Sequence, residues 1–375
     1  MEKILQEDSV KIPVGVLIPA LYKDLSSDAA RHIIEVLKKT GFVKRIYICL
    51  DKAGGEEYKK ALNIVKPLGE KARVIWNDSP RVRAVIDEIE QELAAGIRGK
   101  GHAVWTGLGY VIGKGEVSVL AFHDSDILTY DKEFLIRMLF PVVHLRFQFS
   151  KGYYVRYHNI FYGRVTRLFY FPFLRTLKDI FGYSGYIDYM GDFRYPLSGE
   201  FATFVSQAFM LQFPSDWGIE VGILGEIYRN ITVNRICQVE LTSRYDHKHQ
   251  PVGDSVSKGL CKMASDIART IFVLMSSHGI IITRDAFNAI KYAYLKNARE
   301  MVRYYESYAS MYDGIDYNLH DELKTVDIFV KSIDNAINCF YEDPKGFPMI
   351  PDWKRVESAV DNVFEKLTDA IENPF

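Results

Sequence analysis

The sequence predicts an α/β protein built around a parallel β-sheet. Between residues 13 and 124, short apolar segments rich in β-branched residues alternate with segments whose apolar residues recur at helical spacing. Strands and helices that alternate in this way form βαβ units with right-handed crossovers. At 375 residues the chain is long for one core, so we expect one large domain or two that pack closely.

The regular alternation begins with residues 13–20, PVGVLIPA, an apolar run typical of a buried strand. Residues 28–39 follow as a helix, because Ile33, Ile34 and Leu37 fall on one side of it. Further strands are expected at 45–50, 73–76 and 117–122, and further helices at 56–66, 82–95 and 100–111.

The pattern changes beyond residue 126. Residues 148–158 alternate polar and aromatic side chains, which favours a half-solvated strand. We expect another strand at 235–241, a loop at 182–191, and helices at 201–213, 220–228, 258–275, 283–312 and 321–341. The chain therefore divides into parts at 1–130, 131–254 and 255–375, the last a helical extension for packing or dimerisation.

Composition excludes several classes of protein. Lys plus Arg is 47 and Asp plus Glu is 48, whereas a general binder of nucleic acid has a basic excess. The four cysteines form no C-x-x-C pair, which fits a reducing cytoplasm. No apolar stretch reaches the ~20 residues that a membrane span needs. We expect a cytoplasmic protein that has no transmembrane segment.

The most informative motif is Asp124-Ser125-Asp126, directly after the expected strand at 117–122. Two carboxylates one residue apart repel each other, and burying them unpaired is costly. A divalent cation such as Mg²⁺ or Mn²⁺ removes both problems and often holds substrate phosphates as well. The motif therefore indicates a metal–diphosphate site, with a pair of solvated turn residues as the alternative.

Other residues could complete such a site. Ala20, Asp51 and Asp124 all follow strand ends, where open α/β sheets bind ligands. Lys100, between two glycines before a helix, could meet a phosphate or remain a solvated loop lysine. A histidine such as His247, in the loop after residues 235–241, could complete a metal shell.

Three further segments admit two interpretations each. Gly163-Arg164-Val165-Thr166 opens an expected helix and is either an anion site or an ordinary helix start. Residues 196–200, PLSGE, form a tight turn before a helix whose positive end Glu200 could favour. Glu220 lies in an otherwise apolar helix and is either paired structurally or in contact with a polar substrate.

In chain order these segments resemble the glucosyl-3-phosphoglycerate synthases, retaining glycosyltransferases of the GT-A fold, and the resemblance spans residues 13–251. It implies a Rossmann-like mixed sheet flanked by helices, with a nucleotide-sugar-binding half at 1–130 and an acceptor-binding half at 131–254. Transfer of glucose from UDP- or GDP-glucose to 3-phosphoglycerate, with retention and with Mg²⁺ or Mn²⁺, is the implied activity. The resemblance also implies a homodimer and a role in making a compatible solute.

The resemblance assigns roles residue by residue. The nucleotide sugar would contact Pro19, Ala20, Leu21, Asp24, Asp51, Lys100, Asp124 and Ser125. The acceptor would contact Gly163, Arg164, Val165, Thr166, Arg244 and His249, the metal would be held by Asp126 and His247, and catalysis would depend on Asp126, Glu220 and Lys100. The chain departs from the family at Asp24, Asp51 and His249, where Glu, Ser and Asn are usual. Alternatives are a mannosyl-3-phosphoglycerate synthase, a glucosylglycerate synthase, and a non-catalytic nucleotide-sugar-binding scaffold.

Overall fold

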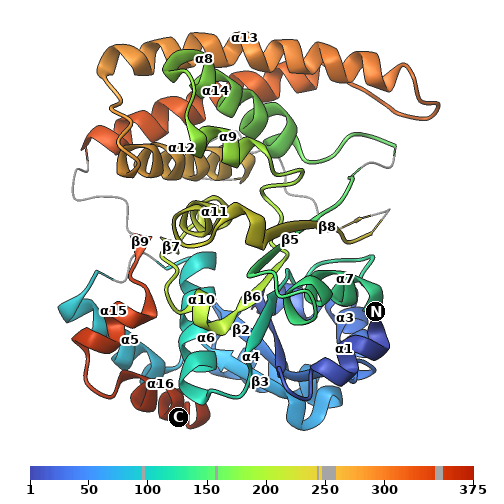
Figure 1. Cartoon of the computed structure of the whole chain (residues 1–375), viewed down its shortest axis with the longest axis vertical. Coiled ribbons are helices and arrows are strands. Elements are labelled where there is room, and N and C mark those ends of the chain that lie inside the picture. The colour runs from blue at the N-terminus through green and yellow to red at the C-terminus, as the bar shows by residue number, and fades with distance from the viewer. Residues whose placement is uncertain (95–97, 157–158, 243–244, 247–258, 343–348) are drawn as a thin grey trace.

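The computed structural model describes residues 1–94, 98–156, 159–242, 245–246, 259–342 and 349–375. A seven-stranded sheet with flanking helices forms one end of the molecule and a layer of helices forms the other (Figure 1). Helix α11 (Ile219–Asn230) lies between them, and both termini lie at the sheet end. The predicted α/β class is confirmed.

The sheet is mixed, with strand order β3-β2-β1-β4-β6-β5-β8. Strands β3, β2, β1 and β4 are parallel, β6 is antiparallel to both of its neighbours, and β8 is parallel to β5. The carboxyl ends of β1, β2 and β4 therefore meet at one edge. The strands are β1 Val14–Leu21, β2 Val43–Asp51, β3 Ala72–Trp76, β4 Val119–Phe122, β5 Phe149–Tyr153, β6 Phe201–Phe204 and β8 Ile236–Glu240.

Helices cover both faces of the sheet, which explains why β1 reads as one continuous apolar run. Val16 and Ile18 belong to the cluster of buried side chains on one face, and Leu17 between them belongs to the cluster on the other. The first face is covered by α3 (Asp28–Lys38), α4 (Gly55–Val65) and α7 (Lys132–Val143), and the second by α5 (Pro80–Glu92), α6 (Lys100–Lys114) and α16 (Val363–Glu372).

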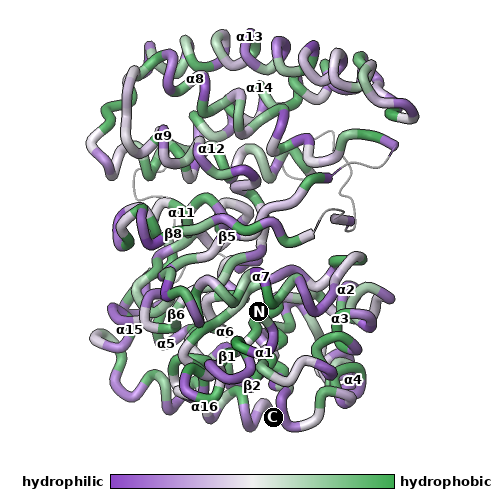
Figure 2. Tube along the Cα trace, turned by 45° about the vertical axis from the view of Figure 1, so that its right-hand side comes forward, coloured by the Kyte–Doolittle hydropathy of each residue, from purple (hydrophilic) through white to green (hydrophobic). Residues whose placement is uncertain are grey.

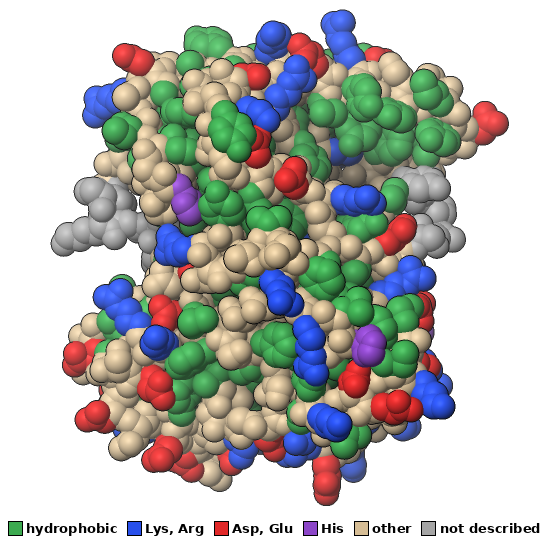
Figure 3. Space-filling model, in the orientation of Figure 1, with side chains coloured by type: hydrophobic (Ala, Val, Ile, Leu, Met, Phe, Trp, Pro, Cys, Tyr) green, Lys and Arg blue, Asp and Glu red, His purple; other side chains and the backbone are tan. Residues whose placement is uncertain are grey.

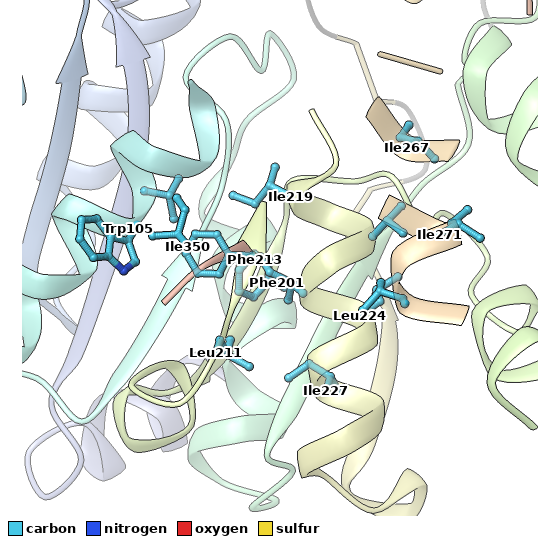
Figure 4. Packing of buried hydrophobic residues seen from close by; sticks show 14 of the residues in the cluster. Trp105, Phe201, Leu211, Phe213, Ile219, Leu224, Ile227, Ile267, Ile271 and Ile350 are labelled. Atoms are coloured by element: carbon cyan, nitrogen blue, oxygen red, sulfur yellow. The ribbon is translucent and has the colours of Figure 1, made fainter. Parts of the chain in front are cut away.

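The helical layer shares one hydrophobic core with the second face of the sheet. Figure 4 shows Ile219 of α11 on the side of Phe213 and Leu224 on the side of Ile271, so α11 joins the two. Figure 2 shows the layer lying above the sheet from a second direction. It consists of α8 Phe171–Phe181, α9 Gly185–Gly191, α12 Gly259–Ser277, α13 Arg284–Ala309 and α14 Leu319–Glu342.

The last helices return to the sheet end. Trp353, at the start of α15 (Trp353–Ala359), stacks on Trp105 of α6 with ring centroids 4.4 Å apart. Helices α15 and α16 pack against α5, and α16 also packs against α6. The shorter elements are α1 Glu2–Asp8, α2 Tyr22–Leu25, α10 Val205–Ala208, η1 Lys66–Lys71, η2 Val165–Tyr170, η3 Val233–Arg235, β7 Phe213–Pro214 and β9 Met349–Ile350.

Four sequence-based expectations are wrong. The strand expected to be half-solvated at 148–158 is β5, in which Phe149 to Gly152 are all buried. The helix expected at 201–213 is strand β6 followed by the short helix α10, because a short and mostly buried run has no periodicity that separates strand from helix. The segment 196–200 therefore precedes a strand. The loop expected at 182–191 contains α9, in which buried Tyr186 and Met190, one turn apart, outweigh the poor helix propensity of glycine.

The outside of the protein carries charges of both signs. Lys, Arg, Asp and Glu side chains are interspersed over the face drawn in Figure 3. In the part of the chain that the structure describes, every helix is too short or too polar to cross a membrane.

Candidate active site

A cleft of about 1120 Å³ lies at the carboxyl edge of the sheet, below the helical layer. Its walls come from the ends of β1, β2 and β4, from residues 160–166, and from α11 and α12. This is where an open α/β sheet binds its ligand. The strand-end residues Pro19, Ala20, Leu21, Asp24, Asp51, Asp124, Ser125 and Asp126 all line it, as predicted.

Lys100, the first residue of α6, lies between two carboxylates in this cleft. Its Nζ is 2.9 Å from Asp124 Oδ1 and 2.8 Å from Glu220 Oε1. Burial opposes the charged form, but the two carboxylates outweigh burial and raise the pKa of Lys100 above its ordinary value. Lys100 is therefore a fixed cation at the end of β4, and a solvated loop lysine is ruled out.

Close backbone packing puts Lys100 there. The amide of Gly101 donates to the carbonyl of Ser215 at 2.9 Å, and a Cβ at Gly101 would lie 1.9 Å from the carbonyl oxygen of Pro214. Only glycine permits this approach. Because α11 begins four residues after Ser215, the same contact brings Glu220 to the start of α6.

Asp126 lies two residues after Asp124, whose negative charge adds to its own. In the described ranges no lysine or arginine lies within ion-pair distance of Asp126. Burial and the neighbouring Asp124 charge raise the pKa of Asp126 to about 6. A divalent cation would relieve this excess of negative charge, and carboxylate oxygens suit Mg²⁺ and Mn²⁺. The described carboxylates at this strand end thus have the chemistry of metal ligands.

The turn before β6 forms the wall behind Asp124. A Cβ on Gly199 would lie 2.9 Å from each carboxylate oxygen of Asp124. Strand β5 holds this turn in place through two hydrogen bonds. Ser198 Oγ donates to the Gly152 carbonyl at 2.6 Å, and the buried Lys151 donates to the Ser198 carbonyl. Gly199 therefore determines how far Asp124 can retreat from the cleft.

Glu200, in the same turn, is fully buried. The prediction that it stabilises the start of a helix is wrong, because strand β6 follows it. Its two carboxylate oxygens accept hydrogen bonds from Tyr245 Oη at 2.9 Å and Tyr154 Oη at 3.0 Å. Burial and the Asp124 charge raise the pKa of Glu200 to about 7. The Tyr154 and Tyr245 rings are stacked, with centroids 3.5 Å apart, so Glu200 joins β5 to the segment after β8.

Asp51 at the end of β2 takes part in an ion-pair chain. Arg98 donates from Nη2 to Asp51 Oδ1 and from Nη1 to Asp78 Oδ1, each at 2.8 Å. Asp78 also accepts from the Ala53 amide at 3.0 Å. Arg98 and Asp51 both line the cleft. The sequence predicted Asp51 as a site residue, and the structure shows that Asp51 is ion-paired with Arg98 there.

The segment 163–166 forms the opposite wall. Gly163, Arg164, Val165 and Thr166 all line the cleft, and the helical run begins at Val165 as predicted. Gly163 has φ 71°, and a Cβ there would lie 2.8 Å from Tyr195 Oη, so glycine is required on both counts. Arg164 is 29% exposed, and its Nε donates to Glu322 Oε1 of α14 at 2.7 Å.

Known proteins resemble the chain over nearly its whole length, although no family model matches it. The glucosyl-3-phosphoglycerate synthase of Persephonella marina is 40% identical over 360 residues, which cover 95% of this chain and 89% of the relative. The chain belongs to the glucosyl-3-phosphoglycerate synthase family. The enzyme of that name from Methanococcoides burtonii is 36% identical over 369 residues, covering 96% of this chain and 90% of the relative.

Solved structures agree on the fold of this family of glycosyltransferases. The Mycobacterium tuberculosis glucosyl-3-phosphoglycerate synthase, in a complex with Mn²⁺, UDP and glucosyl-3-phosphoglycerate, has a TM-score of 0.56 at 21% identity, covering 76% of this chain and 86% of its own. The Rubrobacter xylanophilus mannosyl-3-phosphoglycerate synthase has a TM-score of 0.57 at 17% identity, covering 75% and 80%. The predicted GT-A type fold is confirmed.

Not every predicted site residue can be placed. Arg244, His247 and His249 lie outside the described residues, and in the remainder no three His, Cys, Asp or Glu side chains are grouped to hold a metal. Residues that sequence reasoning missed also line the cleft, among them Arg98, Tyr154, Arg156, Tyr195, Asp216 and Trp217. The Trp217 ring lies under Lys100, with its centroid 5.9 Å from Nζ. The sequence could have indicated Trp217, because it stands three residues before Glu220.

Proposed function

We propose that this glycosyltransferase moves glucose from UDP- or GDP-glucose to the free hydroxyl of 3-phosphoglycerate, with retention of the anomeric configuration and with Mg²⁺ or Mn²⁺. The observation that carries the proposal is the placement of Lys100, Asp124 and Asp126 at one strand end, opposite Arg164. A cation and a metal-binding carboxylate face one side of the cleft, and a guanidinium faces the other. Such a cleft suits two anionic substrates.

The donor side would bind a nucleoside diphosphate. We propose that Pro19, Ala20 and Leu21 contact the nucleotide and that Asp126 and His247 hold the metal. Asp246, next to His247, supports this, since its carbonyl accepts from the Leu128 amide at 2.9 Å beside the Asp124–Asp126 loop. When bound, the metal would supply positive charge to the departing diphosphate. The Mycobacterium tuberculosis relative has been solved with Mn²⁺ and UDP-glucose.

The chain's own residues would do the rest of the work. Lys100 would stabilise the diphosphate as the bond from the anomeric carbon to the phosphate oxygen breaks. Glu220, held beside Lys100, would orient the sugar hydroxyls. Arg164 and the backbone amides near Thr166 would bind the acceptor phosphate, with Arg244 and His249 assisting. The acceptor hydroxyl would attack from the face that the diphosphate leaves, and its proton would pass to the leaving phosphate oxygen.

The single most informative experiment is a product assay with purified protein and Mn²⁺. The donors are UDP-, GDP- and ADP-glucose and GDP-mannose, and the acceptors are 3-phosphoglycerate and D-glycerate. We expect an α-linked glucosyl-3-phosphoglycerate. Mannosyl transfer, or equal use of free glycerate, would favour the alternative synthases. Metal-dependent nucleotide binding without product from any pair would indicate a non-catalytic scaffold.

We also propose that the protein works in the cytoplasm as a homodimer and helps to make a compatible solute. The four cysteines all lie in described parts of the chain and are all unbonded, which suits a reducing compartment. Light scattering after size-exclusion chromatography tests the dimer, and a monomer at micromolar concentration would exclude it.

A further inference from the structure

Glu322 couples the helical layer to the cleft. It lies in the first turn of α14, and its side chain is only 4% exposed. Its carboxylate reaches two arginines of the cleft wall at once, Arg164 through Oε1 at 2.7 Å and Arg167 through Oε2. Removing a charge that is buried and shared in this way leaves two arginines without their counterion.

The two arginines play different parts. Arg167 is 6% exposed, and its Nε and Nη2 donate to the carbonyls of Tyr162 and Phe161 at 3.2 and 2.9 Å. Its guanidinium also stacks over the ring of Tyr305 of α13 at 4.9 Å. Arg167 thus fastens the wall to the helical layer. Arg164 is more exposed and lines the cleft.

The contact with Glu322 leaves one edge of the Arg164 guanidinium for a ligand. Glu322 engages Nε, and in the described part of the chain neither Nη group of Arg164 has a protein acceptor. The edge made by the two Nη groups can bind two oxygens of one phosphate. Because a free arginine side chain has many rotamers, a buried carboxylate that fixes Nε also limits where this edge points.

We propose that Glu322 is a positioning residue for the acceptor phosphate, acting through Arg164. This proposal rests on the proposed function, because it assumes that Arg164 binds that phosphate. It gives the helical layer a part in acceptor selection besides packing. A residue in α14, 158 positions from Arg164 in the sequence, thereby helps to distinguish a phosphorylated acceptor from an unphosphorylated one.

The test is steady-state kinetics of Glu322→Gln with both acceptors. The amide keeps the shape but loses the charge that orients Arg164, so we expect the KM for 3-phosphoglycerate to rise about tenfold. The KM for the nucleotide sugar should change less than twofold, and the KM for D-glycerate, which has no phosphate, should also stay the same. A purely structural role would alter all three, or none.

Glu300→Gln is the matched control. It breaks the Arg175–Glu300 pair at 3.1 Å, which also joins the helical layer across α8 and α13 but does not line the cleft. We expect wild-type kinetics from it. If Glu322→Gln fails to fold, Glu322→Asp keeps the charge but withdraws the carboxylate by one methylene, and the same selective rise in KM is expected.

A double-mutant cycle separates positioning from an independent effect. On an Arg164→Ala background, Glu322→Gln should add less than a twofold further change in the KM for 3-phosphoglycerate. Additive effects would overturn the proposal, as would an unchanged KM in a folded Glu322 variant. If the wild type itself transfers glucose to no phosphorylated acceptor, the proposed function fails first, and the two failures remain distinguishable.

Discussion

Lys100 and Glu220 are 120 residues apart in the sequence and meet at 2.8 Å between Nζ and Oε1. Asp124 completes the group from the other side at 2.9 Å. The lysine is therefore positioned before any substrate arrives, by two carboxylates that belong to a strand end and to a helix start. A preorganised cation of this kind stabilises developing charge without reorganising during the reaction.

Replacing Lys100 should slow the chemical step. We expect Lys100→Met to lower kcat by about 100-fold or more, because the diphosphate loses its fixed cation. Lys114→Met, at the far end of the same helix, removes only a partly exposed pair with Glu372 at 2.7 Å and should retain full activity. Measured kcat values for the two variants test this, and an active Lys100→Met would exclude the lysine from the reaction.

Metal affinity should depend on pH through Asp126. Burial and Asp124 raise its pKa to about 6, and a proton must leave before the carboxylate can bind a cation. The Kd for Mn²⁺, measured by calorimetry, should therefore stay nearly constant between pH 7 and 8 and rise progressively below pH 6. Asp126→Asn should abolish Mn²⁺ binding and activity while remaining folded. A pH-independent Kd in the wild type would contradict the assignment.

The small size of Gly199 should matter to activity. Gly199→Ala places a methyl 2.9 Å from both oxygens of Asp124, so the carboxylate must move toward the cleft or the turn must shift. We expect kcat/KM to fall at least about tenfold, with a loss of unfolding free energy of about 1–3 kcal/mol. Gly191→Ala, where an added Cβ meets nothing within 4 Å, is the control. Equal kinetics in the two variants would show that Asp124 tolerates the displacement.

Glu200 should make the folded protein less stable as pH rises. Its folded pKa is about 7 and its ordinary value is 4.5, so the folded state holds the proton more tightly. Its contribution is fully present below about pH 4.5 and is lost as pH rises through 7. Glu200→Gln removes this dependence, so Tm measured from pH 5 to 8 should fall less steeply than in the wild type. A parallel pair of curves would argue against the raised pKa.

Hydrophobic periodicity predicted much of the fold. The strand at 13–20 and the helix at 28–39 were expected within one residue of where they occur. A strand buried on both faces is a continuous apolar run, and a helix buried on one face has apolar residues at helical spacing, so both can be recognised in the sequence. The segment 201–213 was misread, since Phe201–Phe204 is a short buried strand whose neighbours on both sides come from distant parts of the chain.

The same contrast holds for the site. Asp124 and Asp126 stood out because two acids after an apolar strand demand an explanation. Glu322 gave no such signal, as a glutamate in an amphipathic helix usually faces water. The role that we propose for it follows only from its contacts with Arg164 and Arg167.

By itself, the sequence determined most of the strands and helices of the first 126 residues, which strand ends carry acidic side chains, and which family the chain resembles. These properties are local, since they depend on residues that are close together along the chain. Only the tertiary structure decided that Glu220 holds Lys100, that Gly199 supports Asp124 and that Glu322 holds Arg164. Such pairs arise from packing between elements that are distant in the sequence. What a buried carboxylate contacts therefore depends on its neighbours in space and not on its neighbours along the chain.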